Sequence, residues 1–123
     1  MMVNPVGWFE IYVNDMARAR GFYEQVFQCS LEQMDNPFME MWAFPMESGI
    51  PGAAGALTHM PGVEAGGNSV LIYLQCNDCA DEAARVEDAG GKVVREKMSI
   101  GEHGFIVIIN DSEGNVVGLH SMA

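Results

Sequence analysis

Two stretches of the chain decide its fold: residues 8–24, WFEIYVNDMARARGFYE, and residues 71–87, LIYLQCNDCADEAARVE. Laid on each other at an offset of 63 residues, they coincide at an Asn-Asp pair, at an alanine and at a glutamate. In each stretch, aromatic and β-branched residues predict a strand, and the aspartate predicts the N-cap of a following helix. ALTHM (56–60) also matches GLHSM (118–122), at an offset of 62. The chain is therefore predicted to contain an internal repeat.

Each copy of the repeat is predicted to run strand, helix, strand, strand, strand. The first copy has strands at 6–13, 31–35, 38–44 and 55–60 and a helix at 16–28, and the second has strands at 69–76, 92–99, 104–110 and 115–121 and a helix at 79–89. Gly90 and Gly91 end the second helix, and a tight turn at 111–115 joins the last two strands. One such copy leaves a face of its sheet uncovered, whereas two copies can curl around a shared cleft with each helix on an outer face.

We therefore expect one α+β domain over residues 1–123, with module 1 at about 6–60 and module 2 at about 69–122. Its two tandem βαβββ modules form a curved mixed sheet around a cleft.

Composition narrows the classes of partner. Seventeen acidic and six basic residues give a net charge of −11, which argues against nucleic acid and against an anionic membrane surface. No apolar run approaches the roughly 20 residues of a membrane span, and the first residues lack the basic region of a signal peptide. Three cysteines are too few for a disulfide scaffold, so a reduced, cytoplasmic protein is expected.

Several segments, in this order and spacing, resemble the vicinal oxygen chelate superfamily, which includes glyoxalase I, bleomycin-resistance proteins and extradiol dioxygenases. They are FEIYVND (9–15), RGFYEQVF (20–27), AARVEDAGGKVV (83–94) and HGFIVIINDSEGNVVGL (103–119). The similarity covers nearly the whole chain and is greatest to short glyoxalase-like proteins. It implies paired βαβββ modules, a cleft in the curved sheet and a homodimer, but no particular substrate, because one fold hosts many chemistries.

Metal-dependent members of the superfamily bind a divalent ion with His, Glu or Gln from the first and last strands of each module. The repeat locates the corresponding positions at Trp8, Ala56, Leu71 and Gly118. None of these side chains offers the imidazole or carboxylate that such an ion requires. We therefore expect no metal of the family type and no cofactor, and glyoxalase I chemistry is not expected.

The remaining cleft residues follow from strand alternation. If positions 8 and 71 face the cleft, as the resemblance implies, then Glu10, Tyr12, Tyr73 and Gln75 face it too. Trp42, on the strand at 38–44, is a further candidate for the wall, and His120 shares a face with Gly118. Such an aromatic pocket with one carboxylate suits a flat or cationic organic ligand.

Each candidate also has a structural interpretation. Glu10 is either a general base or a carboxylate hydrogen-bonded across the sheet. The C-x-x-C motif at Cys76 and Cys79 has the form of a dithiol site, but its repeat partners are the apolar Val13 and Met16, which favours a packing role. His59 is expected at a strand end, away from the ligand.

The leading hypothesis is a metal-free protein that binds a small organic ligand. One alternative is an enzyme of the same superfamily, such as a lyase or isomerase, that uses Glu10 as general base without a metal. Another is a metalloenzyme with relocated ligands, namely Glu10, His59 and His120. The last alternative is a purely structural protein, a subunit or dimeric partner that binds no ligand.

Overall fold

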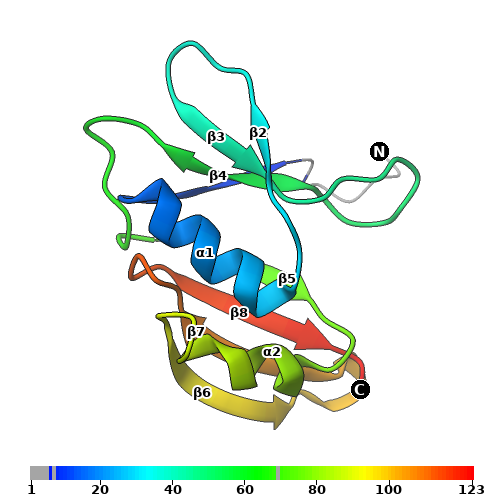
Figure 1. Ribbon diagram of the computed structural model, residues 1–123. Coiled ribbons are helices and arrows are strands. Elements are labelled where there is room, and N and C mark those ends of the chain that lie inside the picture. Colours follow the sequence, from blue (N-terminus) through cyan, green and yellow to red (C-terminus); the bar gives the residue numbers. More distant parts are fainter. Residues whose placement is uncertain (1–5, 7, 69) are drawn as a thin grey trace.

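The computed structural model describes residues 6, 8–68 and 70–123, and Figure 1 shows the order of the elements along the chain. Gly7 and Ser69, which the sequence assigns to the first strand of each module, lie outside the described residues. Module 1 contains β1 (Phe9–Tyr12), α1 (Met16–Phe27), β2 (Glu32–Met34), β3 (Glu40–Ala43) and β4 (Gly55–His59). Module 2 contains β5 (Tyr73–Gln75), α2 (Cys79–Val86), β6 (Lys92–Ser99), the short 3₁₀ helix η1 (Gly101–His103), β7 (Phe105–Asn110) and β8 (Val116–Ser121).

The predicted α+β fold of two βαβββ modules is confirmed. Each module forms a four-stranded mixed sheet, with strand orders β1-β4-β3-β2 and β5-β8-β7-β6. In both sheets the first and last strands of the module pair in parallel and the other neighbours pair antiparallel. The helix and the two strands after it form the long connection that each parallel pair requires.

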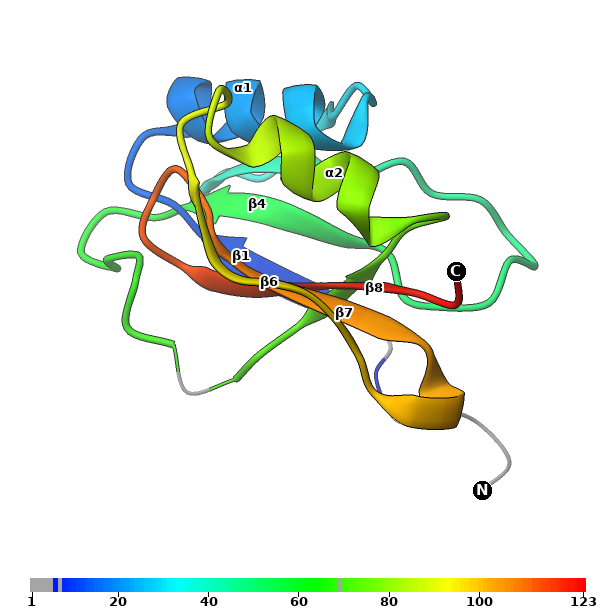
Figure 2. The same ribbon diagram turned by 90° about the horizontal axis from the view of Figure 1, so that it is seen from below.

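Both helices begin where the sequence predicts. The side chain of Asp15 accepts from the amide of Arg18 and that of Asp78 from the amide of Ala80, each at 3.0 Å. The helices lie side by side over the same side of the two sheets (Figure 2), and Arg85 Nε donates to the carbonyl oxygen of Val26 at 2.8 Å. The opposite side of the sheets, here called the open face, is covered by neither α1 nor α2.

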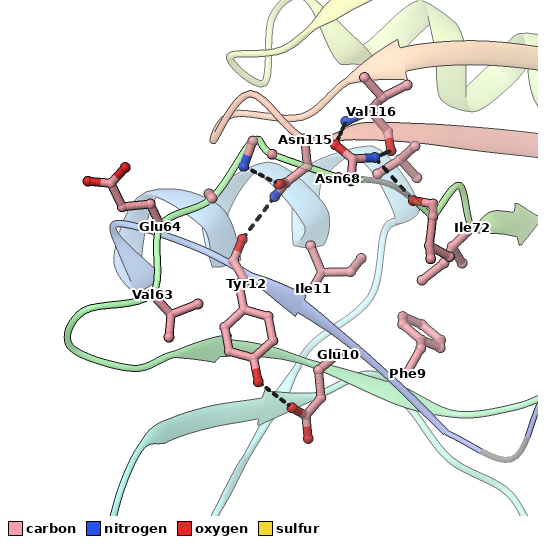
Figure 3. A pocket seen from close by; sticks show the side chains of 15 residues that line it. Phe9, Glu10, Ile11, Tyr12, Val63, Glu64, Asn68, Ile72, Asn115 and Val116 are labelled. Atoms are coloured by element: carbon pink, nitrogen blue, oxygen red, sulfur yellow. Dashed lines mark hydrogen bonds between the residues drawn. The ribbon is translucent and has the colours of Figure 1, made fainter.

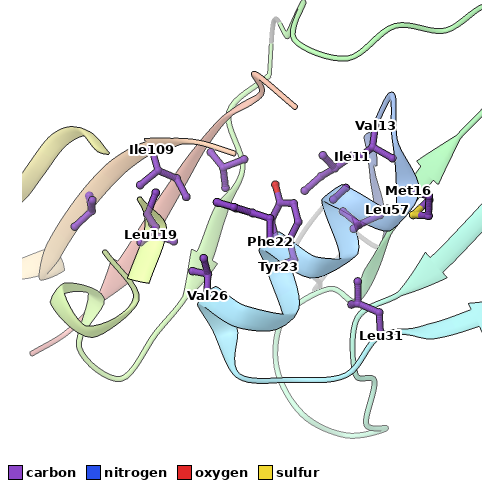
Figure 4. Close-up of a cluster of buried hydrophobic side chains, with 14 of the residues drawn as sticks. Ile11, Val13, Met16, Phe22, Tyr23, Val26, Leu31, Leu57, Ile109 and Leu119 are labelled. Carbon is purple, nitrogen blue, oxygen red and sulfur yellow. The ribbon is translucent and has the colours of Figure 1, made fainter. Parts of the chain in front are cut away.

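The two modules share one hydrophobic core beneath the helices. Phe22 and Tyr23 of α1 are fully buried and lie between side chains of both sheets (Figure 4). Phe22 reaches module 2, where a Cβ built on Gly91 would lie 2.5 Å from its ring. A side chain at position 91 would therefore displace a core residue of the other module.

A polar clasp, residues 111–115, joins module 2 to the start of α1. The carboxylate of Asp111 accepts from the amides of Glu113 and Asn115, each at 2.8 Å, and closes the turn. Its second oxygen accepts from the hydroxyl of buried Tyr23 at 2.7 Å. Burial and the neighbouring Asp111 raise the pKa of Tyr23 well above its usual value, so this phenol stays a donor.

Glu113 makes the longest-range contacts of the clasp. Its side chain is fully buried and accepts from the amides of Asn14 and Asp15, each at 2.9 Å, and from Arg18 Nε at 2.6 Å. Burial alone would raise the pKa of Glu113, but the hydrogen bonds from Arg18, the two amides and Ser112 outweigh it and lower the pKa. A carboxylate from module 2 thus satisfies amide groups just before α1 that would otherwise lack partners.

Replacing Glu113 with glutamine should lower the free energy of unfolding by about 2 kcal/mol, because the amide leaves one side of a charged, buried hydrogen-bond network unsatisfied. Urea unfolding followed by circular dichroism would measure this. Glu102→Gln is the matched control, since the Glu102 side chain is 89% exposed and should change stability little. Equal stability of the two variants would contradict the assigned role of Glu113.

The Glu113 contribution should also depend on pH. Its pKa in the folded chain lies below the usual 4.5, so its stabilisation is fully present above pH 4.5 and is lost as pH falls through the lower folded value. The stability difference between wild type and Glu113→Gln should therefore be constant from pH 6 to 8 and shrink below about pH 4.5. Urea unfolding curves of both proteins across this pH range test the direction of the change. A stability difference that grows on acidification would refute the prediction.

Candidate functional site

The first strand of module 1 presents three polar or aromatic side chains to the open face. Ile11 and Val13 are buried beneath α1, so the alternate positions 8, 10 and 12 point the other way. The hydroxyl of Tyr12 donates to Glu10 Oε1 at 3.0 Å and the indole of Trp8 donates to Glu10 Oε2 at 3.4 Å. The hydrogen bond to Glu10 raises the pKa of Tyr12, which keeps its phenol a donor. Both contacts fix the direction of the Glu10 carboxylate.

The first strand of module 2 makes the equivalent surface. Tyr73 pairs with Gly118 across the parallel strands β5 and β8, and a Cβ built on Gly118 would overlap the ring of Tyr73. The absent side chain at 118 therefore lets the ring lie flat on the sheet. Gln75 pairs with His120 in the same register.

Two adjoining hollows border these side chains. The first, about 530 Å³, lies between β1, the start of β8 and the linker at 61–68 (Figure 3). The second, about 990 Å³, lies between the residues before β1, those leading into β5, and the loop at 50–53. Phe9, Val70 and Ile72 line both hollows, and we call the pair the open-face groove.

The structure distributes the site residues predicted from the sequence over this groove. Glu10 and Tyr12 line the smaller hollow, and the larger is lined by Trp8, Leu71, Tyr73 and Gln75. Gly118 lies beneath Tyr73 and His120 beside Gln75, and neither lines a hollow. The Nε2 atom of His120 is 2.7 Å from the carbonyl oxygen of His103.

Trp42 lies on the other face of its sheet. It pairs with Leu57, which is buried in the shared core, and the guanidinium of Arg20 on α1 stacks on its ring at 3.5 Å. Its indole donates to Glu40 at 3.0 Å. Trp42 therefore packs against α1, and the structure does not bring it to the groove with Glu10.

Several groove residues have no counterpart in the sequence prediction. The linker contributes Val63–Asn68, and Asn115 of the clasp reaches the groove from module 2. Asn115 Nδ2 donates to the carbonyl oxygen of Tyr12 and its Oδ1 accepts from the amide of Gly66, at 3.0 and 2.7 Å. The linker sequence PGVEAGGNS has no apolar period, and its only signals are its glycines and Asn68.

The residues at the family's metal positions do not fit a divalent ion. Trp8, Ala56 and Leu71 carry no imidazole or carboxylate, and the space beside Gly118 is taken by an aromatic ring. Over residues 6, 8–68 and 70–123 no three His, Cys, Asp or Glu side chains gather in a way that could hold a metal.

The relocated set Glu10, His59 and His120 is likewise not brought together. The Nδ1 atom of His59 is 2.9 Å from the carbonyl oxygen of Val13, whose side chain is in the core, while His120 belongs to the other sheet.

The C-x-x-C motif sits at the start of α2. Cys79 is fully buried in the shared core, and its amide donates to the hydroxyl oxygen of Ser121 at 3.0 Å. Burial, with the carboxylate of Glu82 nearby, raises the pKa of Cys76 to about 12. A thiol this difficult to ionise is a poor nucleophile, so the packing interpretation fits the surroundings better than a dithiol site.

No helix in the described residues has the length and apolar character to cross a membrane.

Comparison with known proteins identifies the fold. A glyoxalase I variant from Zea mays is 25% identical with a TM-score of 0.74, covering 96% of this chain and 47% of that one. TnmS3, an antibiotic-binding protein from a Streptomyces species, is 21% identical with a TM-score of 0.71, covering 100% and 99% of the two chains. A glyoxalase/bleomycin resistance protein from the same source is 21% identical with a TM-score of 0.69, covering 94% and 98%.

The chain thus spans about half the length of the maize glyoxalase I structures it matches. No significant match was found among curated proteins. The sequence profile of the Glyoxalase/Bleomycin resistance protein/Dioxygenase superfamily matches residues 6–119. With two βαβββ modules in the expected order, the chain belongs to this superfamily.

Proposed function

We propose that the protein binds a small organic molecule in the open-face groove, with no metal of the family type. The observation that carries this proposal is the Glu10 carboxylate, which two hydrogen bonds hold at the border of an otherwise mainly apolar groove. Trp8, which donates to Glu10, and Tyr73 line the adjoining larger hollow, and their aromatic surfaces suit stacking on a planar ligand. TnmS3, which has the same fold at nearly the same length, is described as antibiotic-binding.

The ligand class follows from charge. Glu10 is the acidic residue that β1 presents to the groove, and the chain as a whole carries −11. A cation bound there gains from the carboxylate and from the faces of the neighbouring aromatic rings, whereas an anion is repelled. We therefore propose a planar or aromatic ligand with a positive charge.

The cationic dye thioflavin T is a suitable probe. Its fluorescence should rise on binding the wild type, and Glu10→Gln should weaken binding about tenfold because the counter-charge is lost. Glu40→Gln is the matched control, since Glu40 accepts from Trp42 as Glu10 does from Trp8 but lies on the other face. Equal affinity in wild type and Glu10→Gln would refute the assigned role of this carboxylate.

The alternative enzymatic function rests on the same carboxylate. Glu10 is hydrogen-bonded to Tyr12 and lines the smaller hollow, which supports a role as general base toward a bound molecule. In that case Glu10→Gln would abolish turnover of a substrate while largely retaining its affinity. Loss of affinity without any turnover in the wild type favours the binding function.

We also propose that the protein is a homodimer. Large apolar side chains around the larger hollow are each at least 38% exposed: Val6, Trp8, Ile50, Val70, Leu71 and Tyr73. Gathered on one surface, they form the kind of patch that marks an interaction site. Light scattering after size exclusion should give twice the chain mass of 13.4 kDa. A single-chain mass at concentrations of about 10 µM would contradict the dimer.

A further inference from the structure

The linker at 61–68 forms one wall of the smaller hollow, opposite β1 (Figure 3). Apart from half-buried Ala65, its residues are exposed and add nothing to the buried core clusters. Val63 closes a turn within the linker by donating to the carbonyl oxygen of Met60 at 3.1 Å. The wall therefore has little packing to hold it in place.

Two asparagine side chains fasten the middle of this linker. The amide of Ala65 donates to Asn14 Oδ1 at 3.0 Å and the amide of Gly66 donates to Asn115 Oδ1 at 2.7 Å. Asn14 lies between β1 and α1 of module 1, and Asn115 belongs to the clasp of module 2. Each module thus holds the middle of the linker, Ala65 and Gly66, by one side-chain hydrogen bond.

Glycines give the 62–67 part of the linker backbone freedom, whereas Asn68 anchors its end. Gly62 and Gly66 have φ values of +88° and +92°, and a Cβ at Gly62 or Gly67 would meet no atom within 4 Å. Asn68, in contrast, is fixed on β8, where Nδ2 donates to the carbonyl oxygen of Val116 and Oδ1 accepts from its amide. Backbone freedom is therefore concentrated at 62–67, between two anchored points.

We propose that Asn14 and Asn115 are positioning residues that hold the 62–67 segment closed over the smaller hollow and so set how fast a ligand enters and leaves. This inference rests on the proposed binding function, which it deepens. In this proposal the segment between Met60 and Asn68 opens as a unit, so releasing one asparagine contact raises the open population at both amides. The loss of one such hydrogen bond raises that population about tenfold.

Asn14→Ala is the informative variant, because the Asn14 side chain is exposed and its only hydrogen bond among the described residues is to Ala65. Asn77→Ala is the matched control: Asn77 occupies the same repeat position and its exposed side chain makes no hydrogen bond with the described residues. Hydrogen exchange of individual amides, followed by NMR, gives the first readout without any ligand.

The decisive amide is Gly66, whose own acceptor, Asn115, is untouched by the substitution. Its exchange should be about ten times faster in Asn14→Ala, with the thermal midpoint unchanged, and unaffected in Asn77→Ala. Faster exchange at Ala65 alone would show that the two contacts open separately and would overturn the proposal.

Stopped-flow mixing with thioflavin T gives the second readout. In Asn14→Ala the association and dissociation rate constants should both rise about tenfold with little change in Kd, because a gate alters the barrier without altering the bound state. A change in Kd with unchanged rates of entry would assign Asn14 to ligand contact and overturn the gate. If the dye binds neither protein, the proposed function fails, whereas the Gly66 exchange still decides whether the segment is latched.

Discussion

The buried carboxylate of Glu113 is the contact on which the arrangement of the two modules depends. It accepts hydrogen bonds from two backbone amides and a guanidinium at the start of α1, about a hundred residues earlier in the chain. If the modules shifted while staying packed, the amides and the buried carboxylate would lose their partners without reaching water, which is costly. The clasp therefore fixes the relative position of the sheets more specifically than apolar packing does, since apolar contact tolerates small displacements.

The open face is a consequence of that arrangement. Both helices lie over the same side of the sheets and draw the apolar positions of β1 and β8 into one core. Alternation then leaves Glu10 and Tyr12 on the uncovered side, where β1 approaches the start of β8. Asn115 completes the link, because one amide contacts Asp111 of the clasp, the backbone of Tyr12 and the linker. The groove wall and the module junction are thus parts of one hydrogen-bond network.

The features that could be predicted from the sequence are those set by local sequence rules and by the internal repeat. Both helix N-caps, the order of all eight strands and the position of the 111–115 turn agree with the structure. The face of Trp42 could not be predicted, because it depends on the register between β3 and β4, which no short-range pattern specifies. Likewise, Asn115 lies 103 positions from Tyr12, and a turn sequence alone indicates its own geometry but not its distant partner.

The positions that hold metal ligands in metal-dependent members of the superfamily carry Trp8, Ala56, Leu71 and Gly118 in this chain. Here Gly118 makes room for the ring of Tyr73, and Trp8 donates to Glu10 where a metal-binding member would place a ligand. These two positions therefore carry or admit an aromatic ring in place of a metal ligand. The proposed binding function draws on these aromatic surfaces and on the Glu10 carboxylate, which Trp8 and Tyr12 hold in place.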